Sequence, residues 1–253
     1  MDQIPIWGVF VLISLLIVGA EEFGWWLGTR RRDRCDQEQN PVGAMVGATL
    51  GLLAFVLAFT FGMAAERFEK RRQVIVDESN SIGTTWLRAE MLPERGVEIR
   101  KLLTDYVDLR VHVVQERRRI EGVKEADVIL AALWVHATAV ARENPQSIVV
   151  GLFTQSLNET IDLHTQRIHY GYRSRIPGAI WWALCAVTIA SLVTLGYHAS
   201  LVARRRPLAL VAVMVAFASI MGLIADLDRP LEGLLTVSQQ SLVDLQSAMH
   251  AAP

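Results

Sequence analysis

Cysteines and catalytic signatures are what this sequence most clearly lacks. Only two cysteines occur in 253 residues, Cys35 in a polar connection and Cys185 in an apolar run, and two such positions are not expected to meet. We find no nucleophile elbow, phosphate-binding loop or metalloprotease helix, and the histidines are scattered. The sequence therefore argues against an enzyme and predicts no disulfide framework, no catalytic residue, no metal and no cofactor.

The best metal candidate shows why no metal is predicted. Glu159, Asp162 and His169 stand at three- and seven-residue spacing, so they share one face of a helix. A solvated or hydrogen-bonded helix face presents the same pattern and is the more common structure. The set is therefore interpreted as a polar face.

An excess of charge is missing as well. The chain carries 25 Lys and Arg against 26 Asp and Glu, a formal net charge of -1, so the total charge indicates no polyanionic partner and argues against nucleic-acid binding. No stretch of the central region alternates between apolar and polar residues as a strand would. What is abundant is apolar sequence, at 52% of the residues and a mean hydropathy of +0.30. This composition predicts an all-α, polytopic integral membrane protein.

Four apolar runs have the length of a bilayer span, at about residues 4–27, 42–65, 178–199 and 207–227. The first run keeps Glu21, Glu22 and a Trp pair where a signal peptide would have a small-residue cleavage site, so it reads as a retained span. Carboxylates at membrane depth are costly, which makes both acids functional candidates. The alternative is that the span ends near Ala20 and both acids lie at headgroup level.

The second run organises the chain, because it continues without a break into the charged segment AERFEKRRQ. One helix is predicted from this span to about Met91, with Pro93 ending it. Phe55, Phe59 and Met63 form an aromatic and Met stripe on this helix that could line a pore. Beside it, small residues near four-residue spacing form a ridge that another helix can approach closely, within the subunit or between subunits: Gly43, Gly47, Gly51, Ala54 and Ala58.

The predicted organisation has four parts: a first transmembrane hairpin over 1–65, a helical extramembrane domain over 66–176, a second hairpin over 177–227 and an amphipathic tail over 228–253. Within the domain, Gly122 is taken as a break between helices and Ala126–Ala141 as a buried core helix. The tail is expected to dock on the domain or to lie on the membrane surface.

Two polar interactions of the helical domain can be anticipated. Asp77, Glu78 and Asn80 on the extension of span two could pair with Arg167 or His164 on a later helix. Such pairs would be structural.

Orientation follows from two short arginine-rich loops, with Arg30, Arg31, Arg32 and Arg34 in one and Arg204, Arg205 and Arg206 in the other. Positive charge in short loops marks the cytoplasmic side. Both termini and the helical domain are then expected on the non-cytoplasmic side of the bacterial inner membrane. Arg67, Lys70, Arg71 and Arg72 after span two argue the other way, but they precede a long domain.

Several runs of the chain resemble the bacterial bestrophin-like domain family of membrane proteins: FTFGMAAERFEKRRQ, DESNSIGTTWLRAEMLP, YVDLR, SLNETIDLHTQRIH, RIPGAIWW and DLDRPLEG. The suggested kinship with bestrophins implies a pentameric anion channel whose second spans line a pore with an apolar neck. Phe55, Phe59 and Met63 are similar to that neck in type and spacing. The dense acidic run that binds calcium in bestrophins is missing here, where only Asp226, Asp228 and Glu232 follow the last span.

The leading hypothesis is therefore a homo-oligomer, a pentamer by resemblance, that conducts a small inorganic ion through a pore around span two. The alternative is a non-conducting membrane scaffold or sensor whose helical domain binds a partner. In either case membrane lipid surrounds the spans. Glu66, Glu69 and Lys70 continue the neck stripe, so the pore mouth could carry either sign of charge.

Overall fold

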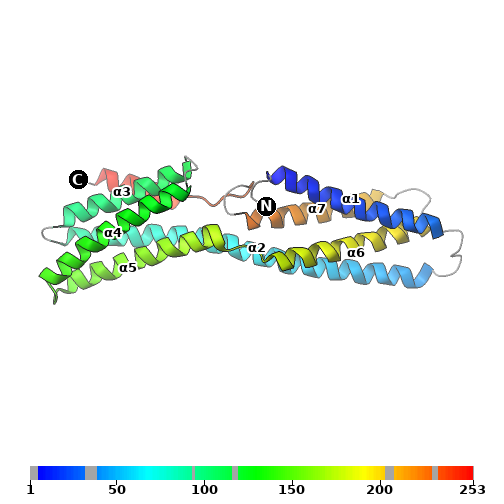
Figure 1. The fold of residues 1–253 in the computed structure, drawn as a ribbon, viewed down its shortest axis with the longest axis horizontal. Helices are drawn as coiled ribbons and strands as arrows, with labels where there is room; N and C mark the ends of the chain where they lie inside the picture. Colours follow the sequence, from blue (N-terminus) through cyan, green and yellow to red (C-terminus); the bar gives the residue numbers. More distant parts are fainter. Residues whose placement is uncertain are drawn as a thin grey trace. The chain divides into compact units, whose positions relative to one another are not determined.

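The computed structural model describes residues 5–31, 39–92, 95–115, 119–202, 208–229 and 233–252. Over these residues all regular structure is helical, which confirms the all-α prediction (Figure 1). A short π-helical turn, His169–Arg173, follows the fifth helix. The helices in chain order are α1 (Ile6–Arg31), α2 (Gln39–Glu90), α3 (Gly96–Gln115), α4 (Arg119–Glu143), α5 (Ile148–Ile168), α6 (Gly178–Val202), α7 (Leu208–Asp228) and α8 (Gln240–Ala251).

The chain divides into two compact units. The transmembrane unit contains Met1–Phe68 and Arg175–Thr236, and the helical unit contains Glu69–Ser174 and Val237–Pro253. Because α2 runs through the boundary at Phe68, one helix contributes to both units. The tail that the sequence groups as 228–253 is shared between the units, with its helix α8 in the helical unit.

Four helices among the described residues are long and apolar enough to cross a membrane: Ile6–Arg30, Val42–Glu90, Gly178–Val202 and Leu210–Asp228. The 25 residues of the first extend roughly 37 Å, which exceeds the hydrocarbon thickness of a bilayer. The 49 residues of the second are about twice what a span needs. Its apolar part is Val42–Ala65, and the remainder carries the charged residues.

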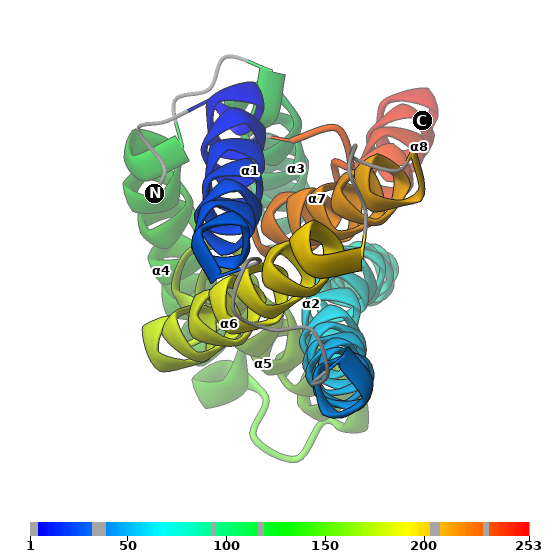
Figure 2. The ribbon, with the colours of Figure 1, turned by 90° about the vertical axis from the view of Figure 1, so that its right-hand side faces the viewer.

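In the transmembrane unit, α1 packs against α6 and α7 (Figure 2). The α1–α6 contact is unusually close because glycines face the partner backbone. A Cβ atom on Gly24 would lie 2.1 Å from the Val193 carbonyl oxygen, and one on Gly196 would lie 2.3 Å from that of Glu21. Large side chains fill the core of this unit: Ile17, Leu53, Leu57, Leu184, Leu192 and Met221.

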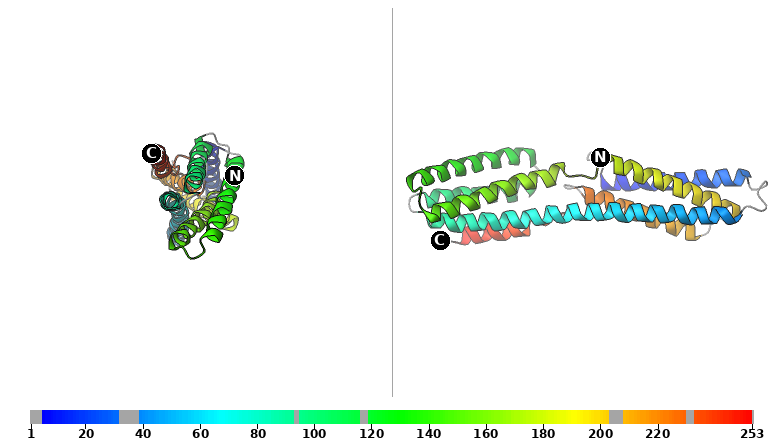
Figure 3. Two further views of the ribbon diagram at one scale, coloured as in Figure 1. Left: turned by 90° about the vertical axis from the view of Figure 1, so that its left-hand side faces the viewer. Right: turned by 90° about the horizontal axis from the view of Figure 1, so that it is seen from below.

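In the helical unit, α3, α4, α5 and α8 share an apolar core with the end of α2 (Figure 3). The core side chains of α4 include Ala126, Leu130, Leu133 and Ala137, which confirms that this segment is a core helix. Helix α8 packs on α3 and buries Leu242 and Met249. Of the two predicted locations of the tail, docking on the helical domain is confirmed for α8.

One sequence interpretation is wrong. Gly122 does not separate two helices, because α4 begins at Arg119 and runs through it. A Cβ atom at this position would lie 2.2 Å from a methyl carbon of Val113 on α3. The glycine permits the close approach of the two helices, a role that a single sequence does not distinguish from a break.

Some residues that the sequence singles out lie outside the described residues, including the second predicted cytoplasmic loop and the part of the first that follows Arg31: Arg32, Arg34, Cys35, Pro93, Arg204, Arg205, Arg206, Pro207 and Glu232.

Candidate functional site

The membrane half of α2 has two faces of different character. One face is buried and contributes to the core of the transmembrane unit: Val46, Leu53, Leu57, Thr60 and Ala64. It contacts α6 through a polar bond as well, since the Ser191 hydroxyl donates to the Thr49 carbonyl oxygen at 2.9 Å. These contacts fix which side of α2 turns away from its own chain.

The opposite face carries the predicted neck stripe. Phe55 stands two residues from both Leu53 and Leu57, which places it about half a helical turn away from them. Phe55 and Phe59 expose 69% and 62% of their surface, while Met63 is half-buried. The described part of the chain thus leaves most of the surface of both residues exposed.

Most of the small-residue ridge lies on this open side. Gly47, Gly51, Ala54 and Ala58 are exposed. A Cβ atom on Gly47 or Gly51 would meet no atom of the described residues within 4 Å, and one on Gly43 would lie 3.4 Å from a ring nitrogen of His198. The close helix contact in this unit is made instead by Gly24 and by Gly28, whose Cβ would lie 2.7 Å from the Tyr197 carbonyl oxygen. The four-residue spacing of Gly24 and Gly28 could have predicted this close contact from the sequence, but it was not recognised.

The candidates for the pore mouth are all exposed. Glu66, Glu69 and Lys70 lie on the outer side of α2, and Glu69 forms an ion pair with Arg72 at 3.3 Å. Arg71, which follows Lys70 on a neighbouring face of α2, is buried. Carboxylates and an ammonium group are thus exposed together at the end of the span.

The two acids of α1 have different environments. Glu21 is fully buried beside α6, and Glu22 is exposed. Only Glu21 therefore belongs to the interior of the transmembrane unit.

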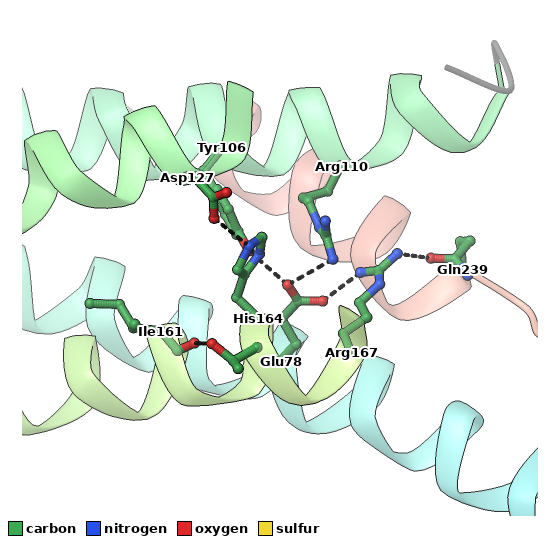
Figure 4. Close-up of polar contacts among 9 residues, drawn as sticks. Glu78, Tyr106, Arg110, Asp127, Ile161, His164, Arg167 and Gln239 are labelled. Atoms are coloured by element: carbon green, nitrogen blue, oxygen red, sulfur yellow. Dashed lines mark hydrogen bonds and ion pairs between the residues drawn. The ribbon is translucent and has the colours of Figure 1, made fainter. Parts of the chain in front are cut away.

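A buried polar cluster occupies the helical unit (Figure 4). At its centre, the Glu78 carboxylate from α2 accepts hydrogen bonds from Tyr106 Oη at 2.8 Å and from Arg167, and it pairs with Arg110 at 3.3 Å. Arg167 also donates to the side-chain oxygen of Gln239, which precedes α8, at 2.7 Å. One carboxylate therefore connects α2 with α3, α5 and the tail.

The electrostatics of this cluster favour a charged Glu78. Burial alone would raise the pKa of its carboxyl group, but the charges of Arg167 and Arg110 outweigh burial and lower the pKa to about 2. Burial and the neighbouring carboxylate raise the pKa of Tyr106 well above its ordinary value, so the phenol keeps its proton. Two guanidinium groups and one carboxylate thus form a buried ionic network.

His164 on α5 extends this network to α4. Its Nδ1 lies 2.9 Å from Tyr106 Oη and its Nε2 lies 3.1 Å from the Asp127 carboxylate. Tyr106 donates its single proton to Glu78, so its Oη and the Asp127 carboxylate are both acceptors for His164. A neutral ring has one N–H and can donate to only one of them, whereas a protonated ring donates to both. Burial, followed by the charge of Arg110, lowers the pKa of His164 and favours the neutral ring.

Sequence reasoning found part of this cluster. The expectation that an acid near residue 78 pairs with Arg167 is confirmed for Glu78, whereas Asp77 accepts from Gln73 on its own helix. The other members were missed because they come from distant segments of the chain: Tyr106 and Arg110 from α3, Asp127 from α4 and Gln239 from the residue before α8. In the part of the chain that the structure describes, no three His, Cys, Asp or Glu side chains are placed to hold a metal ion.

Comparisons with known proteins agree with this architecture. A family model, the Bestrophin-like domain, matches residues 13–242. Solved structures of a bacterial bestrophin homologue from Klebsiella pneumoniae, carrying single substitutions, align with TM-scores of 0.67 and 0.65 at 14% identity. The first alignment covers 94% of this chain and 97% of that chain. A variant of a protein described as a membrane protein aligns with a TM-score of 0.66, also at 14% identity, and covers 95% of each chain.

At this identity the structural likeness establishes the fold, while the family model establishes the relationship. No curated protein sequence matches the chain. The family match covers most of both units, and it confirms the resemblance drawn from the sequence runs. The chain is a multi-pass membrane protein that belongs to the Bestrophin-like family.

Proposed function

We propose that this protein is a homo-oligomeric ion channel, not an enzyme, and that α2 lines its pore. The observation that carries the proposal is the open face of the membrane half of α2. Phe55 and Phe59 extend from the side opposite the core of the transmembrane unit. In a ring of copies, that face can point to a shared axis, and the repeated aromatic rings then form an apolar neck.

The small-residue ridge supports assembly around that axis. Close packing of membrane helices relies on small side chains, because they let backbones approach. Gly47 and Gly51 have room for a neighbour, and no described side chain of the same protomer uses it. Cyclic symmetry would bring an adjacent copy to this side. Five copies are proposed from the bestrophin relationship.

The proposed cargo is a small inorganic ion. Glu66, Glu69 and Lys70 are exposed directly after the neck, and the Glu69–Arg72 pair brings opposite charges together. These residues favour neither cations nor anions, so the proposal assigns no sign of charge to the ion. An apolar neck can hold such a pore closed by excluding water.

The proposal can be tested with a cysteine at the neck, in a background that carries Cys35→Ser and Cys185→Ser. A charged, water-soluble thiol reagent should reach Phe59→Cys and raise ion flux through reconstituted vesicles, since a charge in an apolar neck wets it. Leu57→Cys is the matched control, because Leu57 is only 2% exposed on the core side of the same helix. Equal flux before and after complete modification of Phe59→Cys would favour the non-conducting scaffold.

We also propose that the protein resides in the bacterial inner membrane with the helical unit and both termini outside the cytoplasm. The support is the arginine content of the two short loops. In intact cells, single cysteines at Asp33 and Arg205 should be shielded from an impermeant thiol reagent, while one at the exposed Glu121 should react. The opposite labelling pattern would show that the basic residues after span two determine the orientation.

A further inference from the structure

An apolar pocket of about 520 Å³ lies between α1, α6 and α7 of the transmembrane unit. Its walls include Leu12 and Leu16 from α1, Trp181 and Cys185 from α6, and Met221 from α7. The volume falls within the range of small-molecule sites. Because its walls belong to candidate membrane spans, the pocket is surrounded by lipid and not by water.

One end of the pocket is built from charged residues. Arg175, Asp228 and Arg229 belong to its lining. The Asp228 carboxylate accepts the Ile176 backbone N–H at 2.8 Å and is itself 8% exposed. That bond joins the residue after Arg175 to the residue before Arg229, so both arginines line the same end of the pocket. Two arginines and one aspartate are the charged residues of its described lining.

The charged end lies where a lipid phosphate is expected. Arg175 precedes the candidate span Gly178–Val202 by three residues, and Arg229 directly follows the span that ends at Asp228. Trp181 and Trp182 stand about one turn inside the same boundary, as interfacial tryptophans commonly do. The charged end is therefore at headgroup depth and the apolar walls are at acyl-chain depth.

A second pocket of the same unit provides a contrast. It has a volume of about 640 Å³ between α1 and α7 and is lined by Trp7, Phe10 and Leu223, among others. Its charged residue is Asp226, whose two carboxylate oxygens accept the backbone N–H groups of Leu234 and Leu235. Its described lining residues include no arginine or lysine.

We propose that the pocket between α1, α6 and α7 binds one anionic phospholipid, with its phosphate at Arg175 and Arg229 and an acyl chain along the apolar walls. Guanidinium groups bind phosphate through several N–H donors, which leaves room for each arginine to keep its contacts within the protein. Basic pockets between membrane helices recognise anionic headgroups in this way. Lipid binding at this site does not require ion conduction, so this proposal does not depend on the channel proposal.

The test measures tryptophan quenching in the full-length protein, reconstituted in phosphatidylcholine vesicles containing brominated phosphatidylglycerol or brominated phosphatidylcholine. Brominated phosphatidylglycerol should quench more strongly, and Arg175→Gln should reduce its apparent binding constant about fivefold. Arg142→Gln on α4 of the helical unit is the charge-matched control and should retain the preference. Cys185→Leu keeps both arginines but fills the apolar part, so it should weaken quenching by the brominated anionic lipid.

Several results would overturn the lipid site. Equal quenching by the two brominated lipids would remove charge selectivity, and a preference unchanged in both Arg175→Gln and Cys185→Leu would place the lipid elsewhere. Loss of the preference on adding inorganic phosphate would identify a free-anion site instead. Absence of quenching attributable to Trp181, judged by Trp181→Phe, would mean that protein from another copy covers the pocket.

Discussion

Replacing Phe55 and Phe59 together by Ala is expected to raise ion flux through reconstituted vesicles by about tenfold, because the wider neck no longer excludes water. A tenfold change corresponds to a barrier lowered by only about 1.4 kcal/mol. Removing two rings of aromatic side chains needs to lower the barrier to ion passage by no more than this amount. The measurement combines ion flux with the thermal stability of the assembled particle.

The second readout is needed because the same substitution could act through packing. If the rings are buried between spans, truncation leaves cavities that cost about 3 to 5 kcal/mol each. Phe61→Ala provides the control, since Phe61 lies on the flank of α2 and is 37% exposed. A double variant that assembles stably and conducts no more than the wild type would contradict the neck assignment.

Replacing Glu78 by Gln is expected to destabilise the helical unit by about 3 kcal/mol, because it removes the carboxylate that two buried arginines share. Glu159→Gln is the matched control, since Glu159 is exposed on α5 and its loss should change stability by at most about 0.5 kcal/mol. Thermal melting of both variants in detergent measures the difference. If Glu78→Gln melted at the same temperature as the wild type, the ionic network would make no net contribution to the stability of the folded protein.

The pH dependence of melting isolates the same carboxylate. The folded pKa of Glu78, about 2, lies below its ordinary value of 4.5. Its stabilisation is therefore complete above pH 4.5 and is lost as the pH falls from 4.5 towards 2. The pKa of His164 is also lowered from 6.5, so the unfolded chain takes up its proton first and stability begins to fall below pH 6.5. Glu78→Gln should flatten the lower part of this profile, and an unchanged profile would contradict the assignment.

Local patterns in the sequence were sufficient to predict the long helix and the last two spans. The predicted end of the long helix near Met91 agrees with the end of α2 at Glu90, because the charged extension keeps a helical stripe up to Pro93. The last two spans, predicted to begin at Gly178 and at Pro207, begin at Gly178 and Leu208. Length and hydropathy determine such elements, and both are properties of contiguous sequence.

Pairings between distant helices could not be predicted in the same way. Tyr106 lies on α3 and Asp127 on α4, and only the packing of these helices with α5 brings both side chains to His164. The glycine ridge on α2 was easy to see, whereas the ridge that makes the close contact with α6 is the shorter pair Gly24 and Gly28. A ridge identifies a surface that can pack closely, but the partner depends on the fold.

The number of copies in the particle tests the central claim most directly, because one protomer cannot enclose a pore with the open face of α2. Native mass measurement on the protein extracted with its lipid should give about five times the 28.2 kDa of one chain. Gly51→Leu, placed where a Cβ meets open space in the protomer, should lower that mass if copies pack along the ridge. A particle that remains monomeric in lipid would contradict a pore lined by α2.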